Sequence, residues 1–266
     1  MFADDATLSL SDSNFQVLVN NLNHELSKIY LWTQCNRLTI NFKKTEGVVF
    51  SKRLYNFDNG GIFINGNEIC MKFEQKYLGV IIDRNLNFKN HIKMISSKIS
   101  KSVGIFYRLN NFLSSKSKIS LYYCLVYPYL LYANLVWGGT YITNLNPLIM
   151  LQKKIIRIIN NSTFLAHTDT LFYSNKILKV IDIHKFQLSL HGFKFPHLLD
   201  TTPVHFYNTR SLNQCSIPFQ RLSVSQNSFG YLLPVHWNSL PPYLKGISKI
   251  NLFKKLVKDY LTDAYS

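Results

Sequence analysis

Residues 84–168 combine a helical spacing of apolar side chains with a complete lack of Asp and Glu. The stretch also holds 11 Lys and Arg residues, which must lie mostly on the helix faces opposite the apolar ones. We therefore expect a bundle of amphipathic helices with a basic surface. The apolar residues, spaced 3, 4, 4 and 3 apart, are Ile92, Ile95, Ile99, Val103 and Phe106. The basic residues expected on the surface are Lys93, Lys98, Lys101, Arg108, Lys153, Lys154 and Arg157.

The positive charge is concentrated toward the middle of the chain. The whole sequence has 30 Lys and Arg against 14 Asp and Glu, a net charge of +16, yet residues 1–83 hold 8 basic and 9 acidic residues. Because each phosphate neutralised by Lys or Arg releases a counterion, such a surface suits salt-dependent binding of nucleic acid. The excess of 23 Lys over 7 Arg also fits an AT-rich coding sequence, but that explanation does not account for the missing acids.

The cysteines and the apolar stretches argue against several classes of protein. The four cysteines form neither a C-x-x-C pair nor a zinc-binding spacing, which favours a reducing compartment inside the cell. Residues 119–137 carry no charge and are almost long enough to cross a membrane. Because their tyrosines are scattered and not gathered at the ends, a buried helix is favoured over a membrane span. A membrane-associated protein is kept as the weakest alternative.

The first third of the chain mixes helical and strand patterns. Residues 2–9 are expected to form a strand–turn–strand with two acids at its tip, and Ser13 with Gln16 indicates a capping box for a helix over residues 14–32. Short strand patterns follow, one of which contains an Asn-Gly hairpin turn. They lie at residues 38–42, 48–50, 62–69 and 77–82. This region is therefore expected to be α+β with a small antiparallel sheet.

Helical patterns dominate the remainder, apart from a proline-rich segment. Residues 194–246 contain six of the eight prolines and are expected to form loops with short elements. The helices expected around that segment cover residues 90–108, 117–135, 145–159, 171–190 and 248–261.

Two adjacent carboxylates stand at the start of the chain, in Phe2-Ala3-Asp4-Asp5. Side chains alternate along an extended chain, so one acid can bind a cation while its neighbour supports it. Carboxylate oxygens are natural ligands of Mg²⁺, the ion used in pairs for nucleotidyl transfer. An Asp-Asp pair is also common in solvated surface turns, so this pair alone is weak evidence.

Further segments in the same order give the chain a resemblance to the reverse transcriptases of non-LTR retrotransposons, the LINE or jockey-like group. That family carries a Tyr- or Phe-Ala-Asp-Asp catalytic turn, like residues 2–5, and a W-x3-N-x-L-x-I-N-x-x-K-T stretch, like residues 32–45. Each segment is weakly specific, but the ordered set is not. The other similar segments are Lys76-Tyr77-Leu78-Gly79-Val80, Asn90-His91-Ile92, Tyr127-Pro128-Tyr129, Trp137-Gly138, Leu151-Gln152-Lys153-Lys154, Thr209-Arg210, Trp237-Asn238-Ser239-Leu240-Pro241 and Phe253-Lys254-Lys255.

The resemblance implies a role for each matching residue. Asp4 would bind Mg²⁺ in the catalytic turn, with Asp5 beside it in a less direct role. Lys44 would lie near the phosphates of the incoming nucleotide, although an ordinary solvated lysine explains it equally well. The hairpin Tyr77-Leu78-Gly79 would position the primer end, with a plain core strand and glycine bend as the alternative.

The resemblance also implies a division of the chain. Residues 1–88 would form a partial palm, residues 89–160 a helical thumb-like bundle whose basic faces follow the template–primer backbone, and residues 161–266 a mixed, mostly helical tail. The partners would be an RNA template and a DNA primer, with no membrane.

The chain departs from the family in what it lacks. The family's fingers and second metal-binding aspartate lie upstream of the catalytic turn. We therefore expect this chain to be a carboxy-terminal piece without polymerase activity of its own. The alternative is a non-catalytic, basic nucleic-acid-binding module. The histidines at positions 184, 191, 197 and 205 lack thiol partners and are interpreted as surface or core residues and not zinc ligands.

Overall fold

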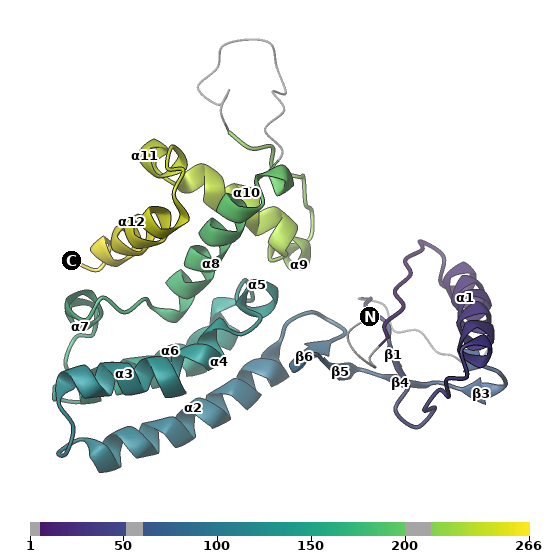
Figure 1. Ribbon diagram of the computed structural model, residues 1–266, viewed down its shortest axis with the longest axis horizontal. Helices are drawn as coiled ribbons and strands as arrows, with labels where there is room; N and C mark the ends of the chain where they lie inside the picture. Colours follow the sequence, from purple (N-terminus) through teal and green to yellow (C-terminus); the bar gives the residue numbers. More distant parts are fainter. Residues whose placement is uncertain (1–5, 52–60, 200–213) are drawn as a thin grey trace, which may run out of the picture. The chain divides into compact units, whose positions relative to one another are not determined.

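The protein is represented by a computed structural model that describes residues 6–51, 61–199 and 214–266 (Figure 1). The chain forms two compact units, Met1–Leu86 and Asn87–Ser266. The predicted thumb-like bundle, residues 89–160, and the predicted tail, residues 161–266, therefore lie in one unit. Their functional division stays a prediction. The fold class is α+β, as expected. In the part of the chain that the structure describes, no helix is both long and apolar enough to cross a membrane.

The first unit packs one long helix against short strands. Helix α1 begins after Asn14, whose side chain accepts hydrogen bonds from the backbone N–H groups of Gln16 and Val17. The capping box predicted at Ser13 is therefore wrong, because the neighbouring Asn occupies the cap position. The elements of this unit are α1 (Phe15–Cys35), β1 (Glu46–Val48), β2 (Phe63–Ile64), β3 (Asn67–Glu68), β4 (Cys70–Lys72), β5 (Glu74–Tyr77) and β6 (Val80–Asp83).

The strands form three separate pairs in the described residues, in place of the one antiparallel sheet that was predicted. Strands β2–β3 and β5–β6 are antiparallel hairpins, whereas β1 and β4 pair in parallel. The strand expected at residues 38–42 is a loop and turn, and residues 6–9 are not a strand. A strand needs a hydrogen-bonded neighbour, and the described residues supply none for these two segments.

A half-buried asparagine joins α1 to strand β2. Asn23 donates from Nδ2 to the carbonyl of Gly61 at 3.2 Å and accepts the N–H of Phe63 at 2.9 Å, as a neighbouring strand would. Below this contact lies the small apolar core of the unit. Its buried members are Val19, Leu26, Ile62, Ile64 and Ile69.

The second unit is helical. Its central pair is α2 (Lys89–Leu109) and α6 (Ile142–Ile159), which pack side by side with α3 (Ser115–Leu125) against them (Figure 1). The five apolar positions predicted for one face of α2 are all buried. The other elements are α4 (Tyr127–Leu131), α5 (Asn134–Trp137), α7 (Asp169–Ser174), α8 (Val180–Lys194), η1 (Pro196–Leu198), α9 (Ser223–Gln226), α10 (Phe229–Ser239), α11 (Pro242–Lys245) and α12 (Ile250–Asp263).

Two helices predicted as continuous are broken. The stretch 117–135 divides into α3, α4 and α5, with Pro128 at the start of α4 and Ala133 in the left-handed region at φ 50°. The stretch 171–190 divides into α7 and α8 around Lys176, at φ 51°. Conversely, α10 continues through Pro234 inside a segment that was predicted to be mainly loop. The final amphipathic helix is confirmed as α12.

Candidate nucleic-acid interface

The acidic turn lies outside the described residues, so the structure gives no geometry for Asp4 or Asp5. Within residues 6–51, 61–199 and 214–266, no group of three or more His, Cys, Asp or Glu side chains is arranged to hold a metal ion. The Mg²⁺ site at Asp4 therefore stays a prediction. The oxygen atoms of the two carboxylates are of the donor type that Mg²⁺ prefers.

Lys44 projects from a short turn between α1 and β1. The turn is closed by hydrogen bonds from the backbone N–H of Lys44 and the hydroxyl of Thr45 to the carbonyl of Asn41, both 3.0 Å long. The Lys44 side chain is exposed and is therefore available to a ligand. Its place near the nucleotide phosphates stays a prediction.

Tyr77, Leu78 and Gly79 form the tip of the β5–β6 hairpin. The register pairs Tyr77 with Val80, and the two residues between them have positive φ, 45° for Leu78 and 81° for Gly79. Both residues of a tight I′-type turn need this conformation, which Gly adopts freely and Leu does not. The strand predicted over residues 77–82 is therefore confirmed at Val80–Ile82, within β6, but it is interrupted by a hairpin turn at Leu78 and Gly79. A branched apolar side chain is held in a strained position there, with 39% of its surface exposed.

The basic residues of α2 lie on its exposed side, opposite the buried face. Lys93, Lys98, Lys101 and Arg108 are all exposed. At 3.6 residues per turn they spread over about 140° of the helix circumference, so they form a broad strip and not a line. At one margin of the strip, the Nζ of Lys98 lies 5.3 Å from the ring centre of Tyr129.

The basic residues of α6 are less outward than predicted. Lys153, Lys154 and Arg157 are each half-buried. The Nζ of Lys154 lies 5.1 Å from the ring centre of Tyr107 on α2, and the guanidinium carbon of Arg157 lies 5.8 Å from that of Phe164. Arg157 also donates from Nε to the carbonyl of Ala166 at 3.0 Å. Lys154 and Arg157 thus each lie near an aromatic ring, a contact that helical spacing alone does not predict.

Lys118 is a buried cation that the sequence analysis did not single out. Its side chain is only 1% exposed, and Nζ donates to Asn110 Oδ1 at 2.7 Å, to Asn161 Oδ1 at 2.8 Å and to the carbonyl of Ile158 at 3.5 Å. Three acceptors match the three donors of an ammonium group. A signal was present in the sequence, because Lys118 begins a four-residue spacing that continues through Tyr122, Val126 and Leu130, all fully buried.

Several motif residues serve packing. Trp137 is fully buried and donates from Nε1 to the carbonyl of Tyr132 at 2.8 Å. A Cβ on Gly138 would lie 2.6 Å from both the carbonyl oxygen of Asn134 and Nδ1 of His184, so only glycine fits there. Gln152, 2% exposed, donates to the hydroxyl of Tyr122 and the carbonyl of Leu178, and accepts the N–H of Val180.

Among the histidines that were interpreted as surface or core residues, His191 is half-buried. His184 is buried with Nδ1 3.1 Å from Asn134 Oδ1, and His197 is exposed. His205 lies outside the described residues. Burial lowers the pKa of His91, His184 and His236 to about 4.

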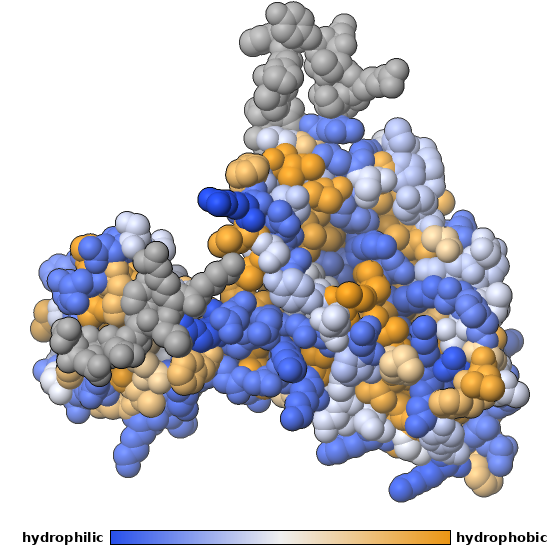
Figure 2. Space-filling view, turned by 180° about the vertical axis from the view of Figure 1, so that it is seen from behind, coloured by the Kyte–Doolittle hydropathy of each residue, from blue (hydrophilic) through white to orange (hydrophobic). Residues whose placement is uncertain are grey.

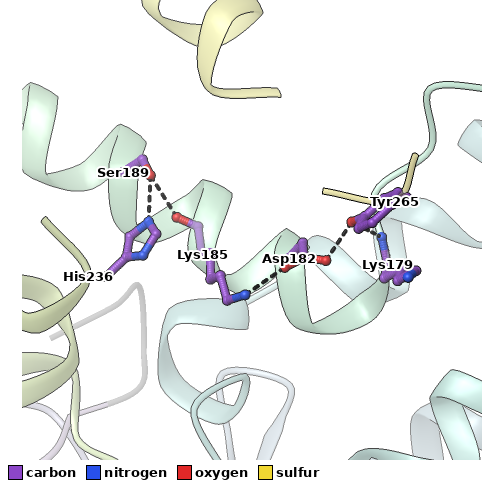
Figure 3. A network of polar contacts seen from close by, with 6 residues as sticks. All are labelled: Lys179, Asp182, Lys185, Ser189, His236 and Tyr265. Atoms are coloured by element: carbon purple, nitrogen blue, oxygen red, sulfur yellow. Dashed lines mark hydrogen bonds and ion pairs between the residues drawn. The ribbon is translucent and has the colours of Figure 1, made fainter. Parts of the chain in front are cut away.

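A chain of polar contacts along α8 includes one of these histidines (Figure 3). Ser189 Oγ lies 2.8 Å from Nε2 of His236 and donates to the carbonyl of Lys185. At the other end of α8, the Tyr265 hydroxyl donates to Asp182 at 2.5 Å, and the Lys185 Nζ pairs with the same carboxylate. Because Ser189 is completely buried, this Ser–His contact is structural and attaches the carboxy-terminal segment to α8.

With this geometry described, comparison with known proteins identifies the class. The chain is a homologue of the RNA-directed DNA polymerases of non-LTR retrotransposons, which confirms the resemblance seen in the sequence. It is 30% identical over 185 residues to the RNA-directed DNA polymerase from mobile element jockey of Drosophila funebris, which corresponds to 68% of this chain and 20% of that relative.

Two further relatives agree. The jockey polymerase of Drosophila melanogaster is 27% identical over 184 residues, and the probable polymerase from transposon X-element of the same fly is 25% identical over 187 residues. Each match covers 68% of this chain and 20% of the relative, so the chain spans about a fifth of the length of the curated relatives it matches. No family model and no solved structure matches.

Proposed function

We propose that the chain is the palm-and-thumb portion of a non-LTR retrotransposon reverse transcriptase, and that it binds an RNA template and a DNA primer. The observation that carries the proposal is the exposed basic strip on α2, in an 85-residue stretch without an acidic side chain, in a homologue of RNA-directed DNA polymerases. A duplex backbone is a row of phosphates, and a basic helix face can follow it without reading its sequence.

The catalytic part of the proposal rests on the resemblance. Asp4, with Asp5 beside it, would hold Mg²⁺, which stabilises charge on the oxygens exchanged during phosphoryl transfer. We expect no primer extension by residues 1–266 alone, since the family's second metal-binding aspartate is upstream of the turn. Extension by the purified chain that is lost in Asp4→Ala would contradict this expectation. A non-catalytic nucleic-acid-binding module is the second candidate, and the same basic strip supports it.

Binding can be tested with two double variants that remove equal charge. We expect Lys93→Gln with Lys101→Gln to weaken binding of an RNA–DNA hybrid about 10-fold at 0.1 M salt, and to reduce the slope of log affinity against log salt by about 2. The control, Lys254→Gln with Lys255→Gln, removes two exposed lysines from α12 and should change affinity less than about 2-fold. Equal effects of the two variants, or a flat salt dependence of the parent chain, would contradict the proposed surface.

The hairpin tip offers a separate test of primer positioning. Leu78→Asn should raise the free energy of unfolding of the Met1–Leu86 unit by about 1 kcal/mol, because Asn tolerates positive φ better than Leu. If the Leu78 side chain contacts the primer end, the same variant should bind template–primer more weakly despite its added stability.

Leu86 provides the matched control for this test. It also has positive φ, at 53°, and the same 39% exposure, but lies away from the hairpin tip. Leu86→Asn should therefore add similar stability without loss of affinity. Urea unfolding and fluorescence anisotropy measure the two effects, and unchanged affinity of Leu78→Asn would remove the primer-positioning role.

A further inference from the structure

An open cavity of about 670 Å³ lies where α2 and α6 end. Its walls come from the carboxy-terminal turns of these helices and from the loops that follow them. Its volume falls in the range of ordinary small-ligand sites. Its lining includes Tyr107, Asn110, Lys154, Arg157, Asn161 and Phe164.

The polar groups of this cavity are donors. Lys154 and Arg157 bring two positive charges, and none of the lining residues is acidic. Behind the wall, the buried Lys118 occupies Oδ1 of both Asn110 and Asn161. With those oxygens engaged, the two side-chain amides have their N–H groups left to offer a ligand. A cavity rich in donors and positive charge suits an anion with many acceptor oxygens, such as a phosphodiester.

Two aromatic rings distinguish this site from a simple basic strip. Tyr107 is 53% exposed and Phe164 is 75% exposed, although each already has a cation near its ring. Binding of a duplex backbone needs the charges but not the rings, because the bases of a duplex are stacked on one another. Unpaired bases, in contrast, stack on exposed aromatic side chains, and this stacking tolerates any sequence.

The surface around the cavity is mixed in the same way. Beyond the two rings, Phe112 and Leu165 at this end of the helices are 83% and 89% exposed. Figure 2 shows that hydrophilic and hydrophobic side chains are intermixed over the face it displays.

We propose that this cavity binds the unpaired nucleotides next to a template–primer duplex, with bases stacked on Tyr107 and Phe164 and phosphates held by Lys154 and Arg157. The proposal rests on the function proposed above. It specifies that the cavity end of the basic surface binds single-stranded nucleic acid. An acidic peptide is the competing ligand, since it too would satisfy the cations.

Three labelled hybrids test the proposal on the full chain by fluorescence anisotropy. One is a blunt RNA–DNA hybrid, the second adds a four-nucleotide RNA overhang, and the third adds an abasic overhang with the same number of phosphates. We expect the natural overhang to bind at least 10-fold more tightly than the blunt hybrid, and the abasic overhang to bind less than 3-fold more tightly. Equal gains from the natural and abasic overhangs would overturn the stacking role.

Variants localise the effect. Tyr107→Ala with Phe164→Ala should remove most of the gain in affinity that the overhang provides and leave affinity for the blunt hybrid unchanged. Tyr107→Phe keeps an aromatic ring and should keep this gain. The control, Phe219→Ala with Tyr243→Ala, removes rings that are 91% and 61% exposed elsewhere in the same unit and should have no effect. An unaltered advantage in the cavity variant would overturn the assignment.

The remaining outcomes separate this proposal from the function it rests on. If the blunt hybrid binds with a steep salt dependence but the overhang adds nothing, the cavity assignment fails and the proposed function stands. If neither hybrid binds at low salt, both fail. A polyglutamate peptide that displaces the overhang hybrid as effectively as unlabelled single-stranded RNA would show that the cavity recognises charge alone and overturn the assignment.

Discussion

The Gln152→Leu variant is expected to lose about 3–5 kcal/mol of the free energy of unfolding of the Asn87–Ser266 unit. Leucine is close in size, so the loss comes from polar groups and not from a cavity. The substitution leaves the Tyr122 hydroxyl, the Leu178 carbonyl and the Val180 N–H without their partner. Each of them is in a buried contact, and an unsatisfied buried group costs about 1–3 kcal/mol.

The measurement is urea unfolding followed by far-ultraviolet circular dichroism. Gln226→Leu is the control, because Gln226 is exposed and its side chain donates from Nε2 to the carbonyl of Gln220 in an exposed contact. It should change stability by less than about 0.5 kcal/mol. Adding Tyr122→Phe to Gln152→Leu should recover about 1 kcal/mol, because it removes one of the stranded groups. Equal losses from the Gln152 and Gln226 variants would show that the three buried hydrogen bonds of Gln152 do not account for the loss of stability.

Gln152 shows how far sequence reasoning reaches in this family. The resemblance drew attention to Leu151-Gln152-Lys153-Lys154, and the helical pattern correctly predicted a helix over this segment. The role of Gln152 depends on Tyr122, on Leu178 just before α8 and on Val180, the first residue of α8, which are 26–30 positions away. A pattern within one helix cannot predict such partners, because they are set by tertiary packing.

The same limit explains which elements were predicted. Helix α2 was predicted well because its apolar residues recur at the helical period over about four turns, and burial of one face decides the structure. The long apolar stretch before Trp137 was predicted as one helix because it is apolar on every side and its periodicity is weak. The helix breaks at Ala133, which adopts a left-handed conformation. Glycine and asparagine usually occupy such positions, so an alanine gives no sequence signal of the break.

The strands were predicted least well for a related reason. Two of the three strand pairs are short hairpins with recognisable turns, at Asn65-Gly66 and Leu78-Gly79. The parallel pairing of β1 with β4 joins segments 24 residues apart and leaves no local pattern. Of the candidate site, the exposed basic face of α2 follows from periodicity, whereas the cavity depends on loops after two different helices and could not be predicted from either alone.

Acidification from pH 7 to pH 5 is expected to lower the free energy of unfolding of the second unit by several kcal/mol. Burial lowers the pKa of His91, His184 and His236 from 6.5 to about 4, with further lowering by Lys98 beside His91 and by Lys185 beside His236. Asp182 opposes the shift of His236 but does not outweigh burial. Between pH 6.5 and pH 4, these three histidines are therefore protonated in the unfolded chain but not in the folded unit. The free energy of unfolding falls as pH falls, because the unfolded state binds more protons.

Asp169 does not produce the same loss of stability in this pH range. A hydrogen bond from Lys179 lowers the pKa of Asp169 from 3.8, so the stability that this carboxylate contributes is lost only at still lower pH.

Urea unfolding at pH 7 and pH 5 measures the effect of the three histidines. His184→Gln should remove about a third of the difference between the two pH values, because one of three titrating sites is gone, whereas His197→Gln, at an exposed position, should leave it unchanged. Equal stability of the parent chain at pH 7 and pH 5 would show that the three imidazoles are hydrated or can rearrange to accept a proton. The close contacts of His184 with Asn134 and of His236 with Ser189 argue against this, because a protonated ring there would have to displace packed neighbours before it reached water.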